Sequence, residues 1–578
     1  MKKIFIYFLF LISSFLLFNS CKKENIDYRY DYRRNTEAAE ASSVRLINLS
    51  TNIQLLVNGD SLTNFFLPPV RPGYIPPEET TPPGTHYFPK DGRLGLTWAM
   101  PQDLFRADGK AEVKTTNRSI YDEVVIKEVD FVAEDDYANP KDYYLLIQHE
   151  QLVEWNRPVV EVPRDITAPS KPDHFKIRIV NFAARPTKAS SPMENLVGPM
   201  TLAFADGTPV STEATSNIPT GAWSEYVEVP YGTYQFKVLT ADGRQVPSVE
   251  QNDRPQDQRI HPGTSSLAVA STQASHITYA SIKTFQPGGI YTVVIHPAQF
   301  TWSNGRDDFT DWQNSFHVIA DGSEPLNRVY TRVQLANALP DSRLQLRINA
   351  GGEATEEVDS GKSSDYVNVI AGERELNVHD ASGQQLLNLR ETLASGGNYT
   401  LWVYPGSDGR VAAVLVSNNL SGSWFVGNPQ EGGDASVDRR RLSFPFDFRF
   451  LNLCPDIPYL AVTDGNGLPF GSSTSTTSTA SNLQPGVPLV DNPYVRYTWN
   501  SAPYSFLAYA SAPGRSPGDW LQHIPHLSSD ALIARKELYT EANRTVPVHE
   551  PGIYTIALMG RDAQGNNNAR FMVVKHTK

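Results

Sequence analysis

Cys21 is the residue of this sequence whose surroundings point most directly to a chemical role. Two lysines lie near the start of the chain, an uninterrupted apolar run covers residues 4–12, and the small residue Ser20 stands directly before the cysteine. This order is typical of an export signal, and the apolar run is shorter than the roughly 20 residues of a membrane-spanning helix. Cleavage after Ser20 would make Cys21 the first residue, where its thiol can carry a lipid through a thioether bond.

We therefore expect residues 1–20 to be a lipoprotein signal peptide and Cys21 to be the lipidated residue. Phe18 and Asn19 stand where Leu and a small residue are commoner, and this relaxed form resembles the lipoprotein signals of Bacteroidota. The alternative is a soluble secreted protein in which Cys21 occurs by chance.

The residues after Cys21 bear on the location of the protein. The charged run at residues 22–27 resembles the surface-export signal of the same lipoproteins, although an ordinary solvated tether has a similar composition. The expected location is the outer membrane, lipid-anchored and exposed at the cell surface, with a flexible stalk over residues 21–42.

No catalytic residue is predicted. The sequence contains no His-Glu-x-x-His, no phosphate-binding Gly-x-x-x-x-Gly-Lys-Ser/Thr and no dinucleotide fingerprint. Residues 361–363 match the last residues of a phosphate-binding loop but lack its upstream glycine, so a polar hairpin tip explains them better.

Neither a metal site nor a cofactor is predicted. His523 and His526 are the only close pair of histidines, and a proline between them makes an exposed loop the simpler interpretation. The acidic clusters at 134–136 and 307–308 lack the alternation of a calcium-binding loop. Cys21 and Cys454 are the only cysteines, so a lipidated Cys21 excludes a disulfide within the chain, and we expect Cys454 to be a small buried apolar side chain.

Aromatic side chains offer better candidates for a binding site. Trp302, Phe309 and Trp312 lie among Asp, Asn and Arg residues, outside the repeated sequence motifs described below. A flat ring beside hydrogen-bonding groups suits a sugar, because the C–H face of the sugar can stack while its hydroxyls are hydrogen bonded. The alternative is that these rings pack between the second and third domains. Trp499 and Trp520 form a second candidate of the same kind.

The charge of the chain excludes one class of partner. The net charge is −12 for all 578 residues, and removal of residues 1–20 takes away two lysines and no acidic residue, which gives −14. Nucleic acids and anionic lipid headgroups are bound by basic patches. We therefore expect no nucleic-acid partner, and membrane attachment through the acyl chains alone.

Four segments begin with one short pattern, in which Arg or Gln stands between apolar residues and Asn follows three positions later. The copies are residues 44–48, 177–181, 333–337 and 448–452. Alternation with a period of two predicts a half-buried strand, and the Asn side chain can cap the turn that follows. Asn58-Gly59, Asp242-Gly243 and Ser382-Gly383 predict hairpin turns further along the segments.

The segments also end alike. Residues 289–292, 397–400 and 552–555 read Gly-x-Tyr-Thr before an apolar run, and residues 142–144 take that place in the first segment without the glycine. A Tyr two residues past a turn glycine is a type of anchor found at corners of β-sandwiches.

The predicted fold is all-β, with tandem immunoglobulin-like antiparallel β-sandwiches after the signal peptide. The predicted units are residues 43–165, 173–320, 326–425 and 442–578, which we call repeats one to four. Each is long enough to bury a core, so we expect modules in a row rather than a solenoid. Residues 530–539 are the best helical exception, with Asp530 as a candidate cap.

The shared opening, turn and closing motifs resemble those of the DUF4397 family of extracellular bacterial repeats. The resemblance covers nearly all of the mature chain and is clearest in repeats two and three. It implies immunoglobulin-like sandwiches in an envelope protein and carries no catalytic residue across. Repeats one and four depart from it through insertions, and repeat one also lacks the glycine before Tyr143.

The expected function is therefore non-catalytic binding or scaffolding at the cell envelope. Glycan capture, adhesion and partnership with other envelope proteins in an outer-membrane complex are the open possibilities. One alternative is an accessory subunit with hydrolase activity in a polysaccharide-utilisation system, which would need two carboxylates about 5–10 Å apart in a cleft. The other alternative is a purely structural spacer.

Overall fold

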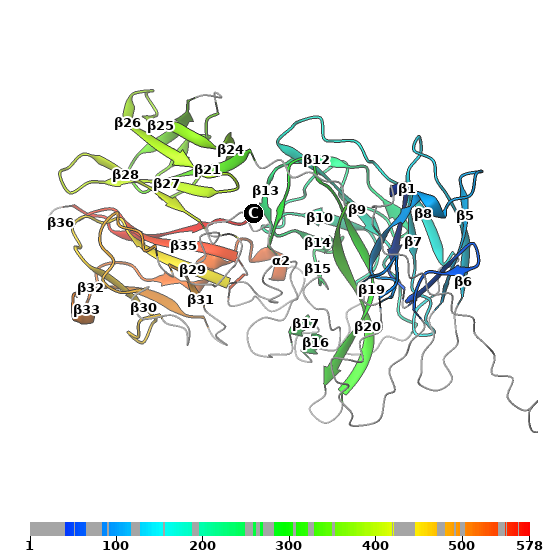
Figure 1. The fold of residues 1–578 in the computed structure, drawn as a ribbon. Helices are drawn as coiled ribbons and strands as arrows, with labels where there is room; N and C mark the ends of the chain where they lie inside the picture. Colours follow the sequence, from blue (N-terminus) through cyan, green and yellow to red (C-terminus); the bar gives the residue numbers. More distant parts are fainter. Residues whose placement is uncertain are drawn as a thin grey trace, which may run out of the picture. The chain divides into compact units, whose positions relative to one another are not determined.

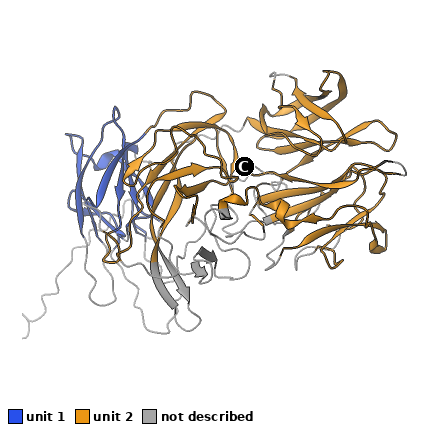
Figure 2. Cartoon of the chain, turned by 180° about the vertical axis from the view of Figure 1, so that it is seen from behind, with its two compact units in different colours: residues 1–147, 157–164 blue, residues 148–156, 165–578 orange. Residues whose placement is uncertain are grey.

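The computed structural model divides the chain into two compact units, shown in Figure 2. Unit 1 comprises residues 1–147 and 157–164, and unit 2 comprises residues 148–156 and 165–578. The structure describes residues 41–50, 52–64, 84–89, 92–116, 128–153, 157–187, 196–248, 258–261, 266–269, 282–303, 308–321, 329–349, 353–418, 420, 446–470, 480–490, 493–496, 503–540, 549–550, 552–563 and 566–578. Cys21 and the predicted signal peptide and stalk before residue 41 lie outside this part of the chain.

The described residues of unit 1 form the strands of repeat one. They are β1 (Ala41–Asn48), β2 (Gln54–Val57), β3 (Asp60–Ser61), β4 (Thr97–Pro101), β5 (Lys110–Thr116), β6 (Val129–Glu134), β7 (Lys141–Leu145) and β8 (Val159–Pro163), with a 3-10 turn η2 at Gln102–Leu104.

Unit 2 contains the strands of the other three repeats. Repeat two has β9 (His174–Asn181), β10 (Met200–Ala203), β11 (Ala222–Trp223), β12 (Val227–Pro230), β13 (Gly232–Tyr234), β14 (Lys237–Thr240), β15 (Gln245–Val246), β16 (Gln258–His261), β17 (Ser266–Val269), β18 (Lys283–Phe285), β19 (Ile290–Ser303) and β20 (Asp308–Ala320). Repeat three has β21 (Tyr330–Asn337), β22 (Arg343–Ile348), β23 (Val358–Asp359), β24 (Val367–Ile370), β25 (Gly372–Asp380), β26 (Gln385–Leu393), β27 (Asn398–Pro405) and β28 (Val411–Ser417). Repeat four has β29 (Phe446–Asn452), β30 (Leu460–Thr463), β31 (Val495–Arg496), β32 (Ser505–Ala512), β33 (Arg515–Trp520), β34 (Leu527–Ser528), β35 (Gly552–Met559), β36 (Asp562–Ala563), β37 (Asn566–Asn567) and β38 (Arg570–Lys575), with η5 (Ser529–Leu532) and the short helix α2 (Glu537–Thr540).

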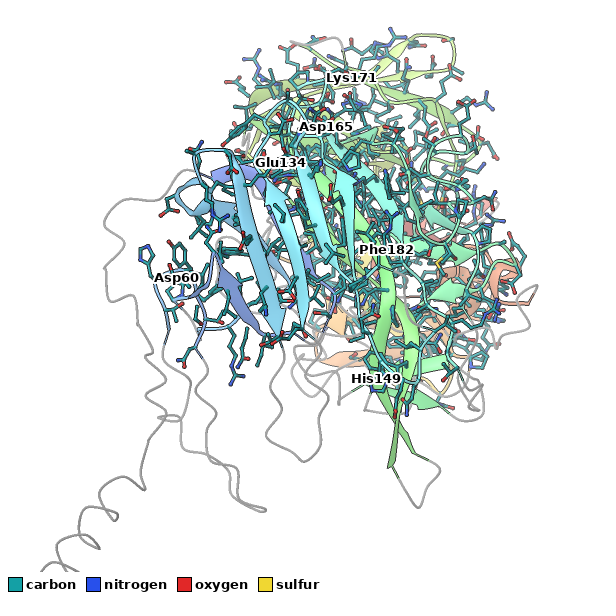
Figure 3. The ribbon with its side chains drawn as sticks, turned by 90° about the vertical axis from the view of Figure 1, so that its right-hand side faces the viewer. Asp60, Glu134, His149, Asp165, Lys171 and Phe182 are labelled. Atoms are coloured by element: carbon teal, nitrogen blue, oxygen red, sulfur yellow. The ribbon has the colours of Figure 1, made fainter. Side chains whose placement is uncertain are left out.

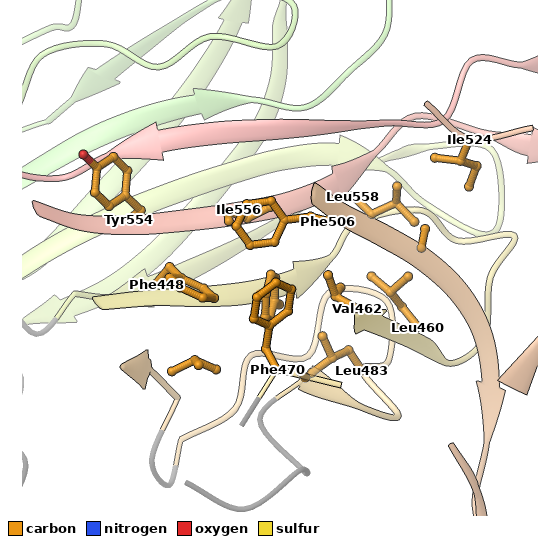
Figure 4. Close-up of a cluster of buried hydrophobic side chains, with 14 of the residues drawn as sticks. Phe448, Leu460, Val462, Phe470, Leu483, Phe506, Ile524, Tyr554, Ile556 and Leu558 are labelled. Atoms are coloured by element: carbon orange, nitrogen blue, oxygen red, sulfur yellow. The ribbon is translucent and has the colours of Figure 1, made fainter. Parts of the chain in front are cut away.

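Each repeat is a sandwich of two main sheets, and the all-β prediction is confirmed (Figure 1). In repeat three the sheets are β24-β21-β27-β28 and β23-β22-β25-β26, and in repeat four they are β31-β29-β35-β38 and β30-β32-β33. Alternate residues of both sheets meet in the core. Figure 4 shows this in repeat four, where Phe448 and Ile556 of one sheet pack with Val462 and Phe506 of the other.

One sheet of each repeat contains a parallel pair that the sequence pattern does not reveal. The first strand lies parallel to the closing strand, as β1 with β7, β9 with β19, β21 with β27 and β29 with β35. The neighbouring pairs in these sheets, such as β27 with β28, are antiparallel. Inward and outward residues alternate with a period of two in both arrangements. The alternation therefore predicts the strands and not their relative direction.

The Asn that ends each first strand has the role predicted for it. Asn48, Asn181, Asn337 and Asn452 are buried, and the Oδ1 of each accepts a hydrogen bond from the backbone N–H two residues later at 3.1 or 3.2 Å. The Nδ2 of each donates to one or two backbone carbonyls of the segments that follow. One side chain thus closes the turn and satisfies buried backbone groups in every repeat.

The glycine and tyrosine of the closing motif also act as a pair. A Cβ added to Gly289, Gly397 or Gly552 would lie 2.5–2.8 Å from the ring of the Tyr two residues later, so that ring covers the glycine. The Oη atoms of Tyr291 and Tyr399 accept hydrogen bonds from the backbone N–H five residues earlier, at 3.0 Å in both cases. The predicted sandwich-corner anchor is confirmed.

Repeat one departs from this plan at the closing strand. Its register aligns Arg45 with Asp142, whereas the equivalent Arg178 and Arg449 align with Thr292 and Thr555. In repeat one, Lys141 therefore stands where the other repeats have the closing Tyr. Arg45 and Asp142 form a buried ion pair, with Nε to Oδ1 at 2.8 Å and Nη2 to Oδ2 at 2.9 Å.

The predicted helix over residues 530–539 is wrong in extent and in its cap. The segment forms the 3-10 turn η5, an extended residue Ile533 and the short helix α2. Ser528, not Asp530, is the cap, because its side chain accepts a hydrogen bond from the N–H of Asp530. Leu532 and Ile533 are buried in repeat four, and this packing overrides the local helical preference. Within the described residues, no helix has the length and apolar character needed to cross a membrane.

We predict that Gly397→Ala lowers the free energy of unfolding of unit 2 by about 1–3 kcal/mol, because the new Cβ displaces the Tyr399 ring from a well-packed position. Urea unfolding followed by tryptophan fluorescence measures the change. Gly465→Ala is the matched control: its nearest contact would be the Cβ of Ser505 at 3.9 Å, and the expected change is below about 0.5 kcal/mol. Equal losses in the two variants would contradict the role assigned to the ring.

Candidate functional site

Repeats three and four share an apolar interface inside unit 2. Ala336, Trp402 and Val416 lie on the outward face of the first sheet of repeat three, and they pack with Leu451, Ala557 and Met572 from the corresponding sheet of repeat four. Trp402 is fully buried in this cluster. The expectation of separate modules in a row is therefore corrected for these two repeats, whose outward sheet faces form a common core.

Beside this apolar interface lies a junction built from polar side chains that the three repeats of unit 2 bury together. Arg449 is 2% exposed. Its Nε donates to Thr555 Oγ1 at 2.9 Å and its Nη1 to the carbonyl of Ser417 at 2.7 Å, and its Nη2 donates to Asn418 Oδ1. Because Ser417 and Asn418 belong to repeat three, this guanidinium links repeats three and four.

Arg332 makes the corresponding link between repeats two and three. It is 3% exposed, its Nε donates to Asn398 Oδ1 at 2.6 Å, and its Nη2 donates to Thr233 Oγ1 at 2.6 Å. The guanidinium also lies over the rings of Tyr231 and Tyr366, at 5.4 and 4.9 Å from their centroids. These are favourable cation–π distances.

His576 occupies the centre of this junction. Its Nδ1 lies 3.3 Å from Gln334 Nε2 and 3.2 Å from Tyr366 Oη, and its Nε2 lies 2.7 Å from Thr555 Oγ1. Because Gln334 Nε2 is a donor, the arrangement favours the neutral tautomer with the proton on Nε2. Burial, followed by the charge of Arg449, holds the pKa of His576 well below its usual value.

A buried ion pair links repeats two and four. Lys237 Nζ lies 3.0 Å from Glu550 Oε1, with side-chain exposures of 4% and 2%, and Glu550 Oε2 accepts a hydrogen bond from the N–H of Ala534 at 3.0 Å. Lys575 lies nearby, and burial lowers its pKa to about 8. Removing one partner of a buried pair generally costs several kcal/mol, so these contacts hold the repeats in a fixed arrangement.

A cavity of about 340 Å³ opens between repeats two, three and four at this junction. Its wall contains Tyr231, Arg332, Ser364, Lys575 and Thr577 among other residues. Small-molecule sites often occupy cavities of roughly 300–1,000 Å³ between domains. The cavity is therefore one of two candidate sites in unit 2.

The predicted aromatic residues of repeat two belong to a long hairpin of β19 and β20. Trp302 and Phe309 face each other in its register, at the end nearest the turn, and their side chains lie outside the described part of the structure. Trp312 is 7% exposed, and its ring centroid lies 5.0 Å from that of His149, which Figure 3 shows beside this hairpin. Trp312 is thus buried with its ring against His149, and it offers no open face to a ligand.

Trp520 is the predicted aromatic residue that does reach the surface. It ends β33, an edge strand of the second sheet of repeat four, and is 49% exposed. Tyr509 of β32 stands directly opposite Trp520 in the antiparallel register. The neighbouring residues Phe506 and Ala508 point into the core, so Tyr509 and Trp520 lie on the outer face. Trp499 lies outside the described residues.

The other predicted motifs do not form reactive groups. Cys454 is fully buried in the core of repeat four, as predicted, and burial raises its pKa to about 11. His523 Nε2 lies 2.7 Å from Asp562 Oδ1, and His526 is exposed. No group of three or more His, Cys, Asp and Glu side chains suited to a metal ion occurs in the described segments.

Sequence reasoning overlooked a Gly-x-Ser-x-Gly pattern at residues 514–518. It lies in the β32–β33 hairpin, whereas a nucleophilic serine of this motif needs a turn from a strand into a helix. The hydroxyl of Ser516 lies 2.8 Å from that of Ser481. A second hydroxyl is not a general base, and we assign Ser516 no reaction.

Sequence reasoning also missed Tyr509 and the cavity wall. Tyr509 could have been found, because it stands between two alanines in a strand of alternating character, where an aromatic ring on the outer face is unusual. Arg332 and Lys575 have no such signal. They are more than 240 residues apart in the sequence, and only the packing of three repeats brings them to one cavity.

A scan against protein-family models and a search of curated proteins found no match to this chain. The resemblance to DUF4397 repeats stays a prediction. The functional argument consequently depends on the geometry of the Tyr509–Trp520 face and of the junction.

We predict that unit 2 loses stability as the pH falls from 7 to 5. The folded-state pKa of His549 is lowered to about 4, and that of His576 is lower than its usual value as well. The unfolded chain, with histidine pKa values near 6.5, then binds protons first, so stability present above pH 6.5 is lost on acidification. The expected loss is about 1–2 kcal/mol for each buried histidine.

Thermal unfolding at a series of pH values measures this effect. His576→Gln should reduce the pH dependence, whereas the exposed His526→Gln should leave the wild-type slope unchanged. A slope that is the same in both variants would show that His576 does not contribute.

Proposed function

We propose that the protein is a non-catalytic lipoprotein of the cell surface that binds saccharides through the Tyr509–Trp520 face of repeat four. The observation that carries the proposal is the cross-strand pair itself, with Trp520 half exposed on an edge strand. Two directly opposed aromatic residues give a flat apolar surface, and the C–H face of a sugar ring stacks on such a surface.

The surroundings of the pair support this assignment. Arg515 and Asp519 form an exposed ion pair on the same edge strand as Trp520. Asp519 stands opposite Ala510 in the register and therefore points to the other face of the sheet from Trp520, so this pair adds charge to the strand edge and not to the aromatic face. Leu468, 65% exposed, follows Gly467, whose added Cβ would lie 3.0 Å from Tyr509 Oη. The turn after β30 therefore lies against the hydroxyl of Tyr509 and places an exposed leucine next to it in the sequence.

The rigidity of unit 2 supports the same function. Repeat four is joined to repeats two and three by the Trp402 cluster, Arg449 and the Lys237–Glu550 pair. A binding face carried by a fixed scaffold loses little conformational freedom when a ligand is bound. Lipidation of Cys21 would hold this scaffold at the membrane.

We expect Trp520→Ala to weaken saccharide binding about tenfold, which corresponds to about 1.4 kcal/mol. A glycan array probed with the detergent-solubilised full chain identifies the bound saccharide, and calorimetric titration with that saccharide measures the affinity. Trp520→Phe, which retains a ring, should keep most of the binding.

Val490→Ala is the matched control, because Val490 is 87% exposed in the same repeat and has no ring. Its affinity should equal that of the wild type. Array binding that survives Trp520→Ala would move the site elsewhere, and a chain that binds no glycan would favour the spacer interpretation.

We expect radioactive palmitate to label the wild-type chain and not Cys21→Ser, because the thioether and the new amino terminus both depend on that cysteine. The variant should also leave the membrane fraction, since the acyl chains are the proposed anchor. Labelling of Cys21→Ser would show that lipidation occurs at another residue.

A further inference from the structure

The cavity at the junction of repeats two, three and four differs from the Tyr509–Trp520 face in its chemistry. Its wall holds three cations, Arg332, Lys575 and Lys578. Lys578 pairs with Asp365, whereas Arg332 and Lys575 form no ion pair with a carboxylate of the described residues. Arg332 contacts the neutral side chains of Asn398 and Thr233 and two tyrosine rings. The described residues contain no carboxylate within ion-pair distance of this guanidinium.

Lys575 is in a similar position. It is half-buried, and its Nζ lies 5.9 Å from the ring centroid of Tyr554. Glu550 is the acid that raises its pKa most, but the two carboxylate oxygens of Glu550 contact other groups, one Lys237 Nζ and the other the N–H of Ala534. Within the described residues, the ammonium of Lys575 has no hydrogen-bond acceptor.

The acids of the cavity wall do not supply the missing charge. Asp365 pairs with Lys578, with Nζ to Oδ2 at 2.7 Å. Asp206 accepts hydrogen bonds from the N–H of Thr208 at 2.9 Å and from its hydroxyl at 2.6 Å, which closes the turn after β10. Asp365 thus has a cationic partner, whereas the partners of Asp206 are neutral and its charge acts on Lys575. The wall has three cationic side chains, Arg332, Lys575 and Lys578, and two anionic ones, Asp206 and Asp365, so its side-chain charge is +1.

We propose that this cavity binds a small carboxylate-bearing molecule, whose carboxylate group is held by Lys575 and Arg332. The ring of Tyr231 and the hydroxyls of Ser363 and Ser364 also line the cavity. They offer an apolar surface and hydrogen-bonding groups to the remainder of the molecule. An acidic monosaccharide such as glucuronate has both features.

A purely structural interpretation accounts for Arg332 but not for Lys575. Arg332 has direct contacts to repeats two and three, so packing alone explains its presence. Within the described residues Lys575 forms no hydrogen bond or ion pair to another repeat, although the charges of Lys237 and Asp206 in repeat two act on it, and the burial that lowers its pKa to about 8 opposes its charged form. A half-buried cation without a partner is costly, and a carboxylate ligand would remove that cost.

The experiment is a calorimetric titration of the full chain with D-glucuronate, with D-glucose as the neutral counterpart of the same ring and succinate as an acid without a ring. Glucuronate should bind at least tenfold more tightly than glucose. Lys575→Met, which keeps the length and removes the charge, should weaken glucuronate binding tenfold or more, and Lys575→Arg should retain it. Lys114→Met in unit 1 removes a surface lysine as the matched control and should not change the affinity.

A second measurement follows the amine directly. Nuclear magnetic resonance of ¹³C-methylated lysines, assigned with the Lys575→Met variant, should show the pKa of Lys575 rising when glucuronate is added. Absence of glucuronate and succinate binding, or binding unchanged in Lys575→Met, would overturn the proposal. Trp520→Ala should leave glucuronate binding intact, so failure of this site and failure of the surface site are distinguishable.

Discussion

In every repeat the first strand lies parallel to the closing strand of the same sheet, and polar side chains of the two strands meet on the face that points away from the core. The pairs are Arg45 with Asp142, Arg178 with Thr292, Gln334 with Thr400, and Arg449 with Thr555. All eight side chains are buried. A buried polar group is costly unless it is hydrogen bonded, so this face must be covered by something that offers partners.

In unit 2 the neighbouring repeats provide that cover. In repeat three, the carbonyl of Ser417 and the Oδ1 of Asn418 accept hydrogen bonds from the guanidinium of Arg449. Arg449 also donates to Thr555 Oγ1, which in turn contacts His576 Nε2. Ala336 and Leu451 are apolar residues on the same outward faces, and they meet in the Trp402 cluster. The repeats therefore assemble through a surface that is part polar and part apolar, and losing one repeat would expose unpaired groups in the next.

The local features of the fold could be predicted from sequence because they depend on residues close together in the chain. Asn337 caps its own turn and Tyr399 covers its own Gly397, and both act within a few residues. The direction of strand pairing could not be predicted, since a period of two fits either direction. The burial of Arg332 and Arg449 could not be predicted either, because an arginine on the outward side of a strand looks solvent-exposed until a neighbouring repeat is placed against it. Trp312 was predicted to be a candidate ligand-binding residue for a related reason, because it packs against His149, which is far away in the sequence.

The location of the candidate sites follows from the same packing. Repeat four has two outward sheet faces: the β31-β29-β35-β38 face is used against repeat three, whereas the β30-β32-β33 face carries Tyr509 and the half-exposed Trp520. The first face packs with complementary partners from repeat three in the Trp402 cluster, and the junction cavity lies beside it. The second keeps a large aromatic side chain in water, which is unfavourable for a protein that has no partner there. At the junction the exposed group is a charge: Lys575 lies at a cavity wall, and no acceptor among the described residues hydrogen bonds to its ammonium. At both places the packing of the repeats leaves a side chain that a ligand can contact: the exposed ring of Trp520 on the outer face of repeat four, and the ammonium of Lys575 at the wall of the junction cavity.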